Sequence, residues 1–256
     1  MPSPCAASDE ELRAIAANAV STIPDVIASL TALDLALPDS DGLKWFNWLY
    51  LKVTKAVDLS IGAQSPTGAP PSGPVWNSPD WLTRLDVVFA GLYLDALAKW
   101  LTPGETAPKC WQVLFRARND VRLARIQFAL AGVNAHIDRD LPSAIVQTCR
   151  EFSVEPVHLS PQYRDYTAIN DLLDGIIDTA KKELLVGLLG DNLPSLNLVE
   201  NLVAMWGLRG TREFAWTNAE LLWHAQTIPG LADRLLDGLD DSADLAGRGL
   251  LAPVGV

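Results

Sequence analysis

The stretch Arg84-Leu-Asp-Val-Val-Phe-Ala-Gly-Leu-Tyr-Leu-Asp95 decides the fold. Almost every position in it is apolar, apart from Arg84, Asp86 and Asp95. A helix that is apolar on nearly all of its faces is a helix buried nearly all round. We therefore expect an all-α protein containing a helix from Ser78 to Trp100, with Ser78 as the N-cap and Pro79 in the first turn.

Helical periodicity continues on both sides of this stretch. Ser8-Asp-Glu-Glu11 has the pattern of a capping box and predicts a helix to about Ser21, and Pro24 starts the next one. Further helices are expected over 43–57, 109–139, 142–152, 166–189, 196–206 and 211–226, with one more from Leu231 and a frayed end over 240–256. The Gly- and Pro-rich residues 60–77 predict one long loop. We expect a single domain over 1–256, an irregular bundle of about eight helices.

The composition limits the classes of function. The 256 residues are 49% hydrophobic and carry a net charge of −11, with no stripe of Lys and Arg, which disfavours nucleic acid as a partner. No apolar run is long enough for a membrane span, and the first residues lack the basic and apolar regions of a signal peptide. We expect a cytoplasmic protein that does not bind membranes. A homodimer is left open.

A polar stripe marks the end of the helix expected over 109–139. At 100° per residue, one narrow stripe contains Arg122, Arg125, Ala129, Gly132, His136 and Asp140. His136 and Asp140 are i,i+4 neighbours, so their side chains meet or share a ligand. Two interpretations compete: Asp140 caps the helix that follows at Pro142 and pairs with His136, or the two are an acid/base and its orienting group, or two ligands of an ion.

Asp86 raises the same question inside its apolar helix. A buried ionised carboxylate needs a partner, and a salt bridge to Arg84, Arg122 or Arg125 would supply one. Asp86 also shares a helix face with Tyr93, so that a carboxylate and a phenol can project together. On the late helix, Arg212 and Trp216 fall on one face and predict a cation–π contact. Asn47, among aromatic residues, is expected to pack in the core.

Cofactor motifs are scarce. The sequence has neither GxGxxG nor a Walker motif, so we expect no nucleotide cofactor. Three histidines are too few for a trinuclear zinc site of the helical phosphoesterase kind. One divalent metal ion held by His136, Asp140 and Asp86 remains the alternative to a site without a cofactor.

The segment Asn134-Ala-His-Ile-Asp-Arg-Asp-Leu141 resembles an uncharacterised, all-helical family of unknown function from bacteria and fungi, whose members carry N-A-H-I-N-x-D-L. Segments around Phe46–Thr54, Arg84–Ala90, Tyr93–Leu97 and Ala215–Trp216 also resemble the family, so the likeness covers most of the chain. The resemblance implies that Asn47, Asp86, Asp95, Asn134, His136 and Asp140 belong to a shared pattern, and it brings no assigned chemistry. This chain departs from the pattern at Asp138, where the family has Asn, which favours cation binding over a role for a neutral amide.

These patterns favour a cofactor-independent acid/base enzyme of isomerase, lyase or cyclase type, acting on a small, largely apolar metabolite, with natural-product biosynthesis as one setting. His136 would be the acid/base, Asp140 its orienting group and Asp86 a charge-tuning residue. Substrate contacts would come from Asn134, Tyr93, Asn47 and Trp216, with the 60–77 loop as a candidate lid. The alternatives are a metal-dependent hydrolase and a non-catalytic small-molecule binding protein.

Overall fold

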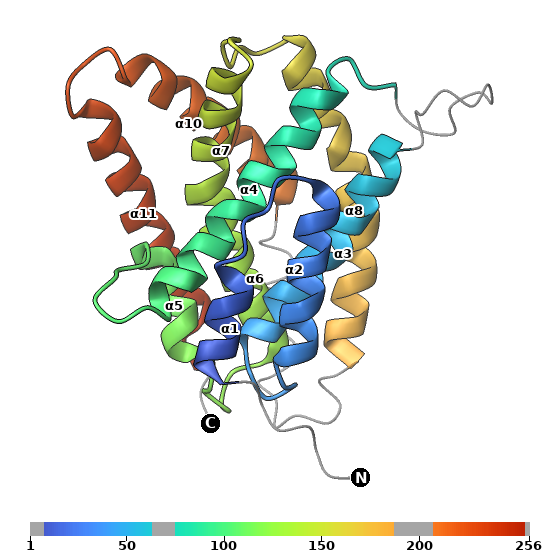
Figure 1. The fold of residues 1–256 in the computed structure, drawn as a ribbon, viewed down its shortest axis with the longest axis vertical. Coiled ribbons are helices and arrows are strands. Elements are labelled where there is room, and N and C mark those ends of the chain that lie inside the picture. Colours follow the sequence, from blue (N-terminus) through green and yellow to red (C-terminus); the bar gives the residue numbers. More distant parts are fainter. Residues whose placement is uncertain (1–7, 63–74, 187–206, 254–256) are drawn as a thin grey trace.

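The computed structural model describes residues 8–62, 75–186 and 207–253 as a bundle of helices with no strand among them (Figure 1), which confirms the all-α, single-domain prediction. The helices are α1 Asp9–Ala16, α2 Ile23–Ala36, α3 Leu43–Gly62, α4 Pro79–Trp100, α5 Lys109–Ala117, α6 Arg125–Ala135, the π-helix η1 His136–Asp140, α7 Leu141–Glu151, α8 Pro161–Val186, α10 Leu208–Ala225 and α11 Leu231–Leu250. The predicted helix 196–206 and most of the 60–77 loop lie outside the described residues.

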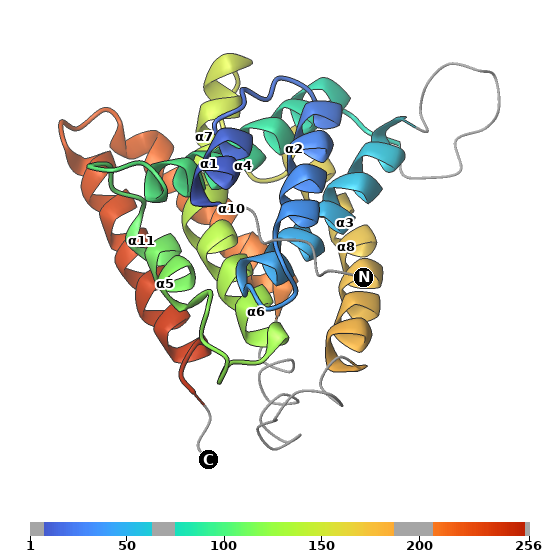
Figure 2. The same cartoon turned by 60° about the horizontal axis from the view of Figure 1, so that its bottom comes forward.

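The α4 helix lies inside the bundle as its sequence predicts. It packs against α1 and α2 on one side and against α7 and α8 on the other (Figures 1 and 2). Its N-terminus is not capped by Ser78, whose side chain makes no capping hydrogen bond. Instead, the buried Asp165 of α8 accepts hydrogen bonds from the backbone N–H groups of Asn77 and Ser78, at 2.9 and 2.6 Å. A carboxylate from a distant segment therefore stabilises the start of α4.

The continuous helix predicted over 109–139 is wrong, because the chain turns between α5 and α6. At this turn Asp120 accepts hydrogen bonds from both the backbone and the guanidinium of Arg122, which holds a non-helical conformation. The carbonyl oxygen of Arg118 accepts from the backbone N–H of Gly42 at 2.6 Å, so the turn is also tied to α3. Arg122 consequently lies outside the polar stripe predicted for it.

The boundary predicted near Asp140 is a π-helical turn within one long helical run. The N–H of Leu141 donates to the carbonyl of His136, five residues back. Pro142, in the first turn of α7, has no N–H and its ring would clash with the carbonyl four residues before it, and the wider π-turn accommodates both effects. The turn places His136 and Asp140 together, with both side chains buried.

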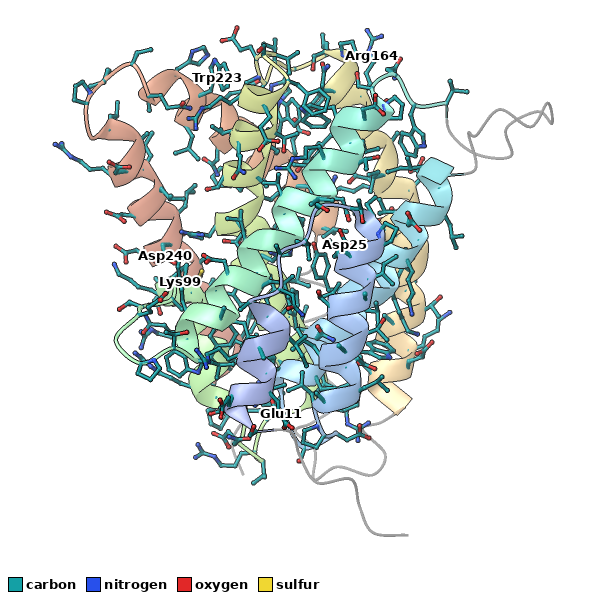
Figure 3. All side chains as sticks on the ribbon, in the orientation of Figure 1. Glu11, Asp25, Lys99, Arg164, Trp223 and Asp240 are labelled. Atoms are coloured by element: carbon teal, nitrogen blue, oxygen red, sulfur yellow. The ribbon has the colours of Figure 1, made fainter. Side chains whose placement is uncertain are left out.

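The frayed end predicted over 240–256 is wrong as far as Leu250, to which α11 continues, while its last residues, 254–256, lie outside the described residues. Asp240 accepts hydrogen bonds from the backbone N–H groups of Lys109 and Cys110 and so caps α5 (Figure 3). Farther along α11, Ala243 is buried and its carbonyl accepts from the side-chain amide of Asn134 at 2.7 Å. These contacts require a partner from elsewhere in the chain, so the Gly- and Ala-rich sequence is ordered by packing. No helix within the described ranges is long and apolar enough to cross a membrane.

Candidate functional site

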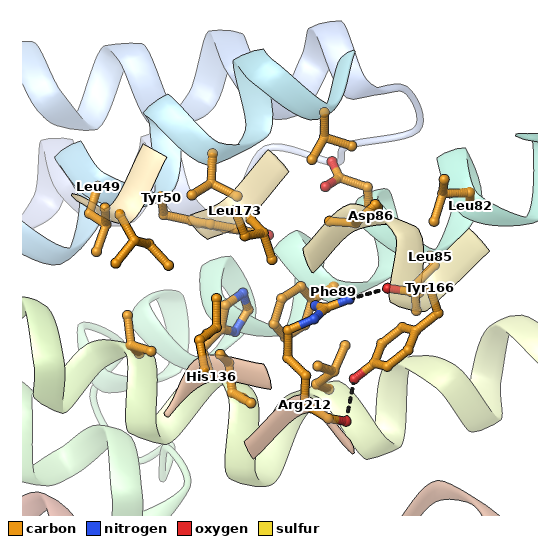
Figure 4. A pocket seen from close by; sticks show the side chains of 18 of the residues that line it. Leu49, Tyr50, Leu82, Leu85, Asp86, Phe89, His136, Tyr166, Leu173 and Arg212 are labelled. Carbon is orange, nitrogen blue, oxygen red and sulfur yellow. Dashed lines mark hydrogen bonds between the residues drawn. The ribbon is translucent and has the colours of Figure 1, made fainter. Parts of the chain in front are cut away.

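A cavity of about 100 Å³ lies between α3, α4, α8 and α10, with η1 at one wall (Figure 4). Most of its lining is aliphatic or aromatic. The polar side chains among the lining residues are Tyr50, Asp86, His136, Tyr166 and Arg212. An apolar cavity of roughly 150 Å³ can take up a molecule as large as benzene, and the volume of this cavity is of the same order. Space and lining together suit a small, largely apolar molecule.

His136 is held in place by Asp140. The imidazole Nδ1 lies 3.2 Å from Oδ2 of Asp140, which is fully buried. The same carboxylate accepts hydrogen bonds from Trp111 Nε1 at 2.8 Å and from Arg139 Nη1 at 2.7 Å. A side chain that accepts from these donors also accepts from Nδ1–H, which makes Nδ1 the protonated nitrogen of a neutral imidazole. Nε2 then carries a lone pair, and it is buried without a hydrogen-bond partner.

Aromatic rings enclose the imidazole. Phe89 stacks on it at 3.5 Å between ring centroids, with 6° between the planes, and the Tyr50 ring stands edge-on at 4.7 Å. Burial among these rings lowers the pKa of His136, and the hydrogen bond to Asp140 opposes that shift without reversing it. The neutral form therefore predominates at pH 7, as a general base requires.

Asp86 lines the cavity from α4, and no Lys or Arg side chain of the described residues forms an ion pair with it. The predicted salt bridge is not formed: Arg84 pairs with Glu151, Arg122 pairs with Asp120, and the Arg125 guanidinium lies 4.2 Å from the centroid of Trp45. Asp86 as a whole retains some exposure, while its Oδ2 is buried and has no hydrogen-bond partner among the described residues. Burial, with a smaller contribution from the charge of Asp58, raises the pKa of Asp86 to about 7.

Arg212 enters the cavity from the first half of α10. Its Nε donates to Oδ1 of Asn170 at 2.7 Å, and Nη2 donates to the backbone carbonyl of Tyr166 at 2.8 Å. The guanidinium also lies 4.1 Å from the centroid of the Tyr166 ring, whose hydroxyl donates to the Arg212 carbonyl (Figure 4). The predicted cation–π partner, Trp216, instead packs on Trp81 and Tyr166. All hydrogen-bond partners of the guanidinium are neutral.

Of the residues predicted for the site, His136 and Asp86 line the cavity, and Asp140 lies behind His136. The other predicted contacts do not line it. Asn47 donates to the carbonyl of Leu30, and Trp216 Nε1 donates to Glu220 at 3.2 Å. Tyr93 is buried, with its ring centroid 6.3 Å from that of His136. Asn134, as described above, holds α11.

Sequence reasoning missed Tyr50 and Arg212 as site residues. The hydroxyl of Tyr50 is buried and meets no hydrogen-bond geometry among the described residues, since the nearby Thr54 hydroxyl donates to the Tyr50 backbone carbonyl. Burial, with the charges of Asp86 and Asp140, raises the pKa of Tyr50 well above 10, and the Thr54 hydroxyl only partly opposes this shift. Tyr50 therefore stays protonated and can donate a hydrogen bond. Two sequence features could have indicated these residues: a tyrosine near Asn47 in an aromatic run, and an arginine on a helix face with aromatic residues. Both features also fit packing in the core.

Nothing in the described part of the chain gathers three His, Cys, Asp or Glu side chains in a geometry that could hold a metal ion. The carboxylate of Asp140 is already occupied by Trp111, His136 and Arg139. The positions of His136, Asp140 and Asp86 therefore do not support the alternative in which these three residues hold a metal ion.

Comparison with known proteins identifies a family but assigns no biochemical activity. A search of curated proteins and a search of solved structures each found no match. The model of a family of unknown function, DUF5995, matches residues 23–253, nearly the whole of the described bundle including the cavity. The chain therefore belongs to the DUF5995 family of unknown function.

Proposed function

We propose that this protein is a cofactor-independent acid/base enzyme, of isomerase, lyase or cyclase type, acting on a small, largely apolar molecule bound in the cavity. The observation that carries the proposal concerns three cavity-lining residues, His136, Asp86 and Tyr50. Each holds a buried polar atom that finds no hydrogen-bond partner within the described part of the chain. Such atoms are costly in a folded protein and are expected where a ligand satisfies them.

His136 is the general base in this proposal. Asp140 holds the imidazole in the tautomer that leaves Nε2 free, and burial keeps the ring neutral. Nε2 accepts a proton from a C–H group of the bound molecule next to a carbonyl. The Tyr50 hydroxyl supplies a hydrogen bond to the oxygen on which negative charge develops.

Asp86 is the complementary acid. With a pKa of about 7, a large share of its carboxyl groups is protonated near neutral pH and can donate a proton. Proton removal at His136 and proton return from Asp86 amount to an isomerisation. Where a leaving group takes the second proton, the same two steps are an elimination.

The pH dependence follows from the two shifts. The base loses activity as the pH falls through the lowered pKa of His136, below 6.5. The acid loses activity as the pH rises through the Asp86 pKa of about 7. We therefore expect a bell-shaped rate profile with its falling alkaline limb near pH 7.

Untargeted mass spectrometry tests the proposal without a known substrate. Extracts of small metabolites are incubated with the purified protein and with His136→Gln, and products of unchanged mass or of small-molecule loss are sought. We expect a conversion that His136→Gln slows by at least about 100-fold. His224→Gln is the matched control, because that side chain is 71% exposed. A folded His136→Gln protein that converts the substrate at the wild-type rate contradicts the proposal.

A non-catalytic binding protein is the second candidate, and one observation favours it. Nε2 of His136 is inaccessible behind its aromatic neighbours, so substrate reaches it only after a ring such as Phe89 moves. A ligand recovered unchanged after long incubation with the wild-type protein, at every pH from 5 to 9, would support binding without turnover.

A further inference from the structure

Arg212 carries a buried positive charge without a negative partner in the part of the chain that the structure describes. Arg212 is 7% exposed, and its side-chain hydrogen bonds go to the neutral oxygens of Asn170 and Tyr166. Burial of an uncompensated charge is costly, and burial lowers the pKa of Arg212. An arginine nevertheless keeps its proton at neutral pH.

Two other arginines with little side-chain exposure, Arg118 and Arg139, are paired with carboxylates. Arg118, with 12% side-chain exposure, contacts the carboxylate of Asp41 at 2.5 Å. Arg139, at 18%, contacts Asp140 at 2.7 Å. The fold therefore supplies carboxylates where an arginine serves to join helices. Arg212 differs in that it faces a cavity instead of a carboxylate.

The guanidinium is fixed and has donors to spare. Nε and Nη2 each use one hydrogen, and the Tyr166 ring supports one face of the group at 4.1 Å. An arginine has five N–H donors, so three remain after these two bonds. Figure 4 shows the side chain rising from α10 into the cavity, tied to the Tyr166 backbone. A fixed fork of this kind matches the two oxygens of a carboxylate.

We propose that the molecule bound in the cavity is a small monocarboxylic acid with an apolar body, its carboxylate paired with Arg212 and its body packed against the aliphatic walls. This inference rests on the proposed function and names its substrate class. A single arginine balances one negative charge, whereas a phosphate would bring a second charge into a cavity that already contains Asp86. The volume of about 100 Å³ also limits the body to a few carbon atoms or one ring.

Calorimetry on the full chain tests the proposal with acids and their neutral amides. The probes are hexanoate and benzoate, compared with hexanamide and benzamide. For the wild-type protein we expect each acid that binds to do so at least about tenfold more tightly than its amide. Arg212→Gln should weaken binding of the acid at least about tenfold and leave binding of the amide within about twofold. Arg209→Gln is the matched control, because that exposed arginine one turn earlier pairs with Asp171 and Asp174.

Several results would overturn the proposal: amides that bind as tightly as the acids, acid binding unchanged in Arg212→Gln, or no binding of either acid at 10 mM. If Arg212→Gln does not fold, the acid-to-amide preference of the wild-type protein and its reduction in Arg212→Lys decide the question. His136→Gln separates this inference from the proposed function. It should lose turnover and retain acid binding. Wild-type protein that binds the acids through Arg212 but converts no substrate refutes the chemistry alone. Wild-type protein that converts a substrate but binds amides as tightly as acids refutes the substrate class alone.

Discussion

Asp165 and Asp86 are both buried acidic side chains near the α4–α8 contact, and the protein treats them in opposite ways. The Asp165 carboxylate accepts from the backbone and side-chain amides of Asn77 and from the backbone of Ser78, at 2.6 to 2.9 Å. Asp86 has a buried oxygen without a donor. The first carboxylate holds two helices together, and the second only destabilises the protein unless a ligand uses it. The difference separates a structural acid from a candidate functional one.

Removal of Asp165 should have the largest effect. Asp165→Ala removes the charged acceptor of the backbone N–H groups of Asn77 and Ser78, and we expect a loss of about 3 kcal/mol in the free energy of unfolding. Urea denaturation measures it. Asp80→Ala, an exposed acid in the first turn of the same helix, is the control and should cost less than about 1 kcal/mol. Equal losses in the two variants would remove the basis of the comparison.

Asp86→Asn should do the reverse and stabilise the protein at alkaline pH. The folded pKa is about 7, above the usual 3.8, so the folded state binds more protons between these values and stability falls as the pH rises from about 4 to 7. Asparagine does not titrate, so the Asp86→Asn variant does not lose stability over this pH range. At pH 8 we expect it to exceed the wild-type free energy of unfolding by about 4 kcal/mol, and at pH 5 by less than half of that. A pH-independent difference would show that Asp86 titrates normally.

Gly132→Ala tests how tightly the wall of the cavity is packed. An added Cβ would lie 2.3 Å from the ring of Phe46, a buried cavity-lining residue, so we expect destabilisation by about 1–3 kcal/mol. Gly91→Ala in α4 is the matched control, because nothing lies within 4 Å of its added Cβ. The control should gain about 0.5–1 kcal/mol from helix propensity. Thermal melts of both variants check the signs, and stabilisation by Gly132→Ala would mean that the wall is loosely packed.

The sequence predicted the features that depend on neighbouring residues. The capping box of Ser8 and Glu11 forms with both hydrogen bonds, because its partners are three residues apart. The helix start at Pro79 and the contact of His136 with Asp140 are likewise local. The apolar pattern of Arg84–Asp95 similarly indicated the buried position of α4.

The features that were missed depend on distant residues. The donors to Asp165 come from positions 87 and 88 residues away, and Asp240 caps a helix 130 residues earlier. The Arg212 guanidinium makes its cation–π contact with Tyr166 of α8 and not with Trp216 of its own helix. Helical periodicity does not reveal a contact between two helices. The π-turn depends on Pro142, a residue that the sequence shows but whose effect on the preceding helix has more than one outcome.

The state of His136 is the most direct test of the account, because it requires no substrate. Nitrogen-15 NMR of the histidine-labelled full chain, with His136→Gln to assign the signal, reports which ring nitrogen carries the proton. We predict a neutral imidazole at pH 7, protonated at Nδ1 and unprotonated at Nε2, that takes up a second proton only below pH 6.5. An imidazolium at pH 7, or a neutral ring protonated at Nε2, would contradict the assignment of His136 as the general base.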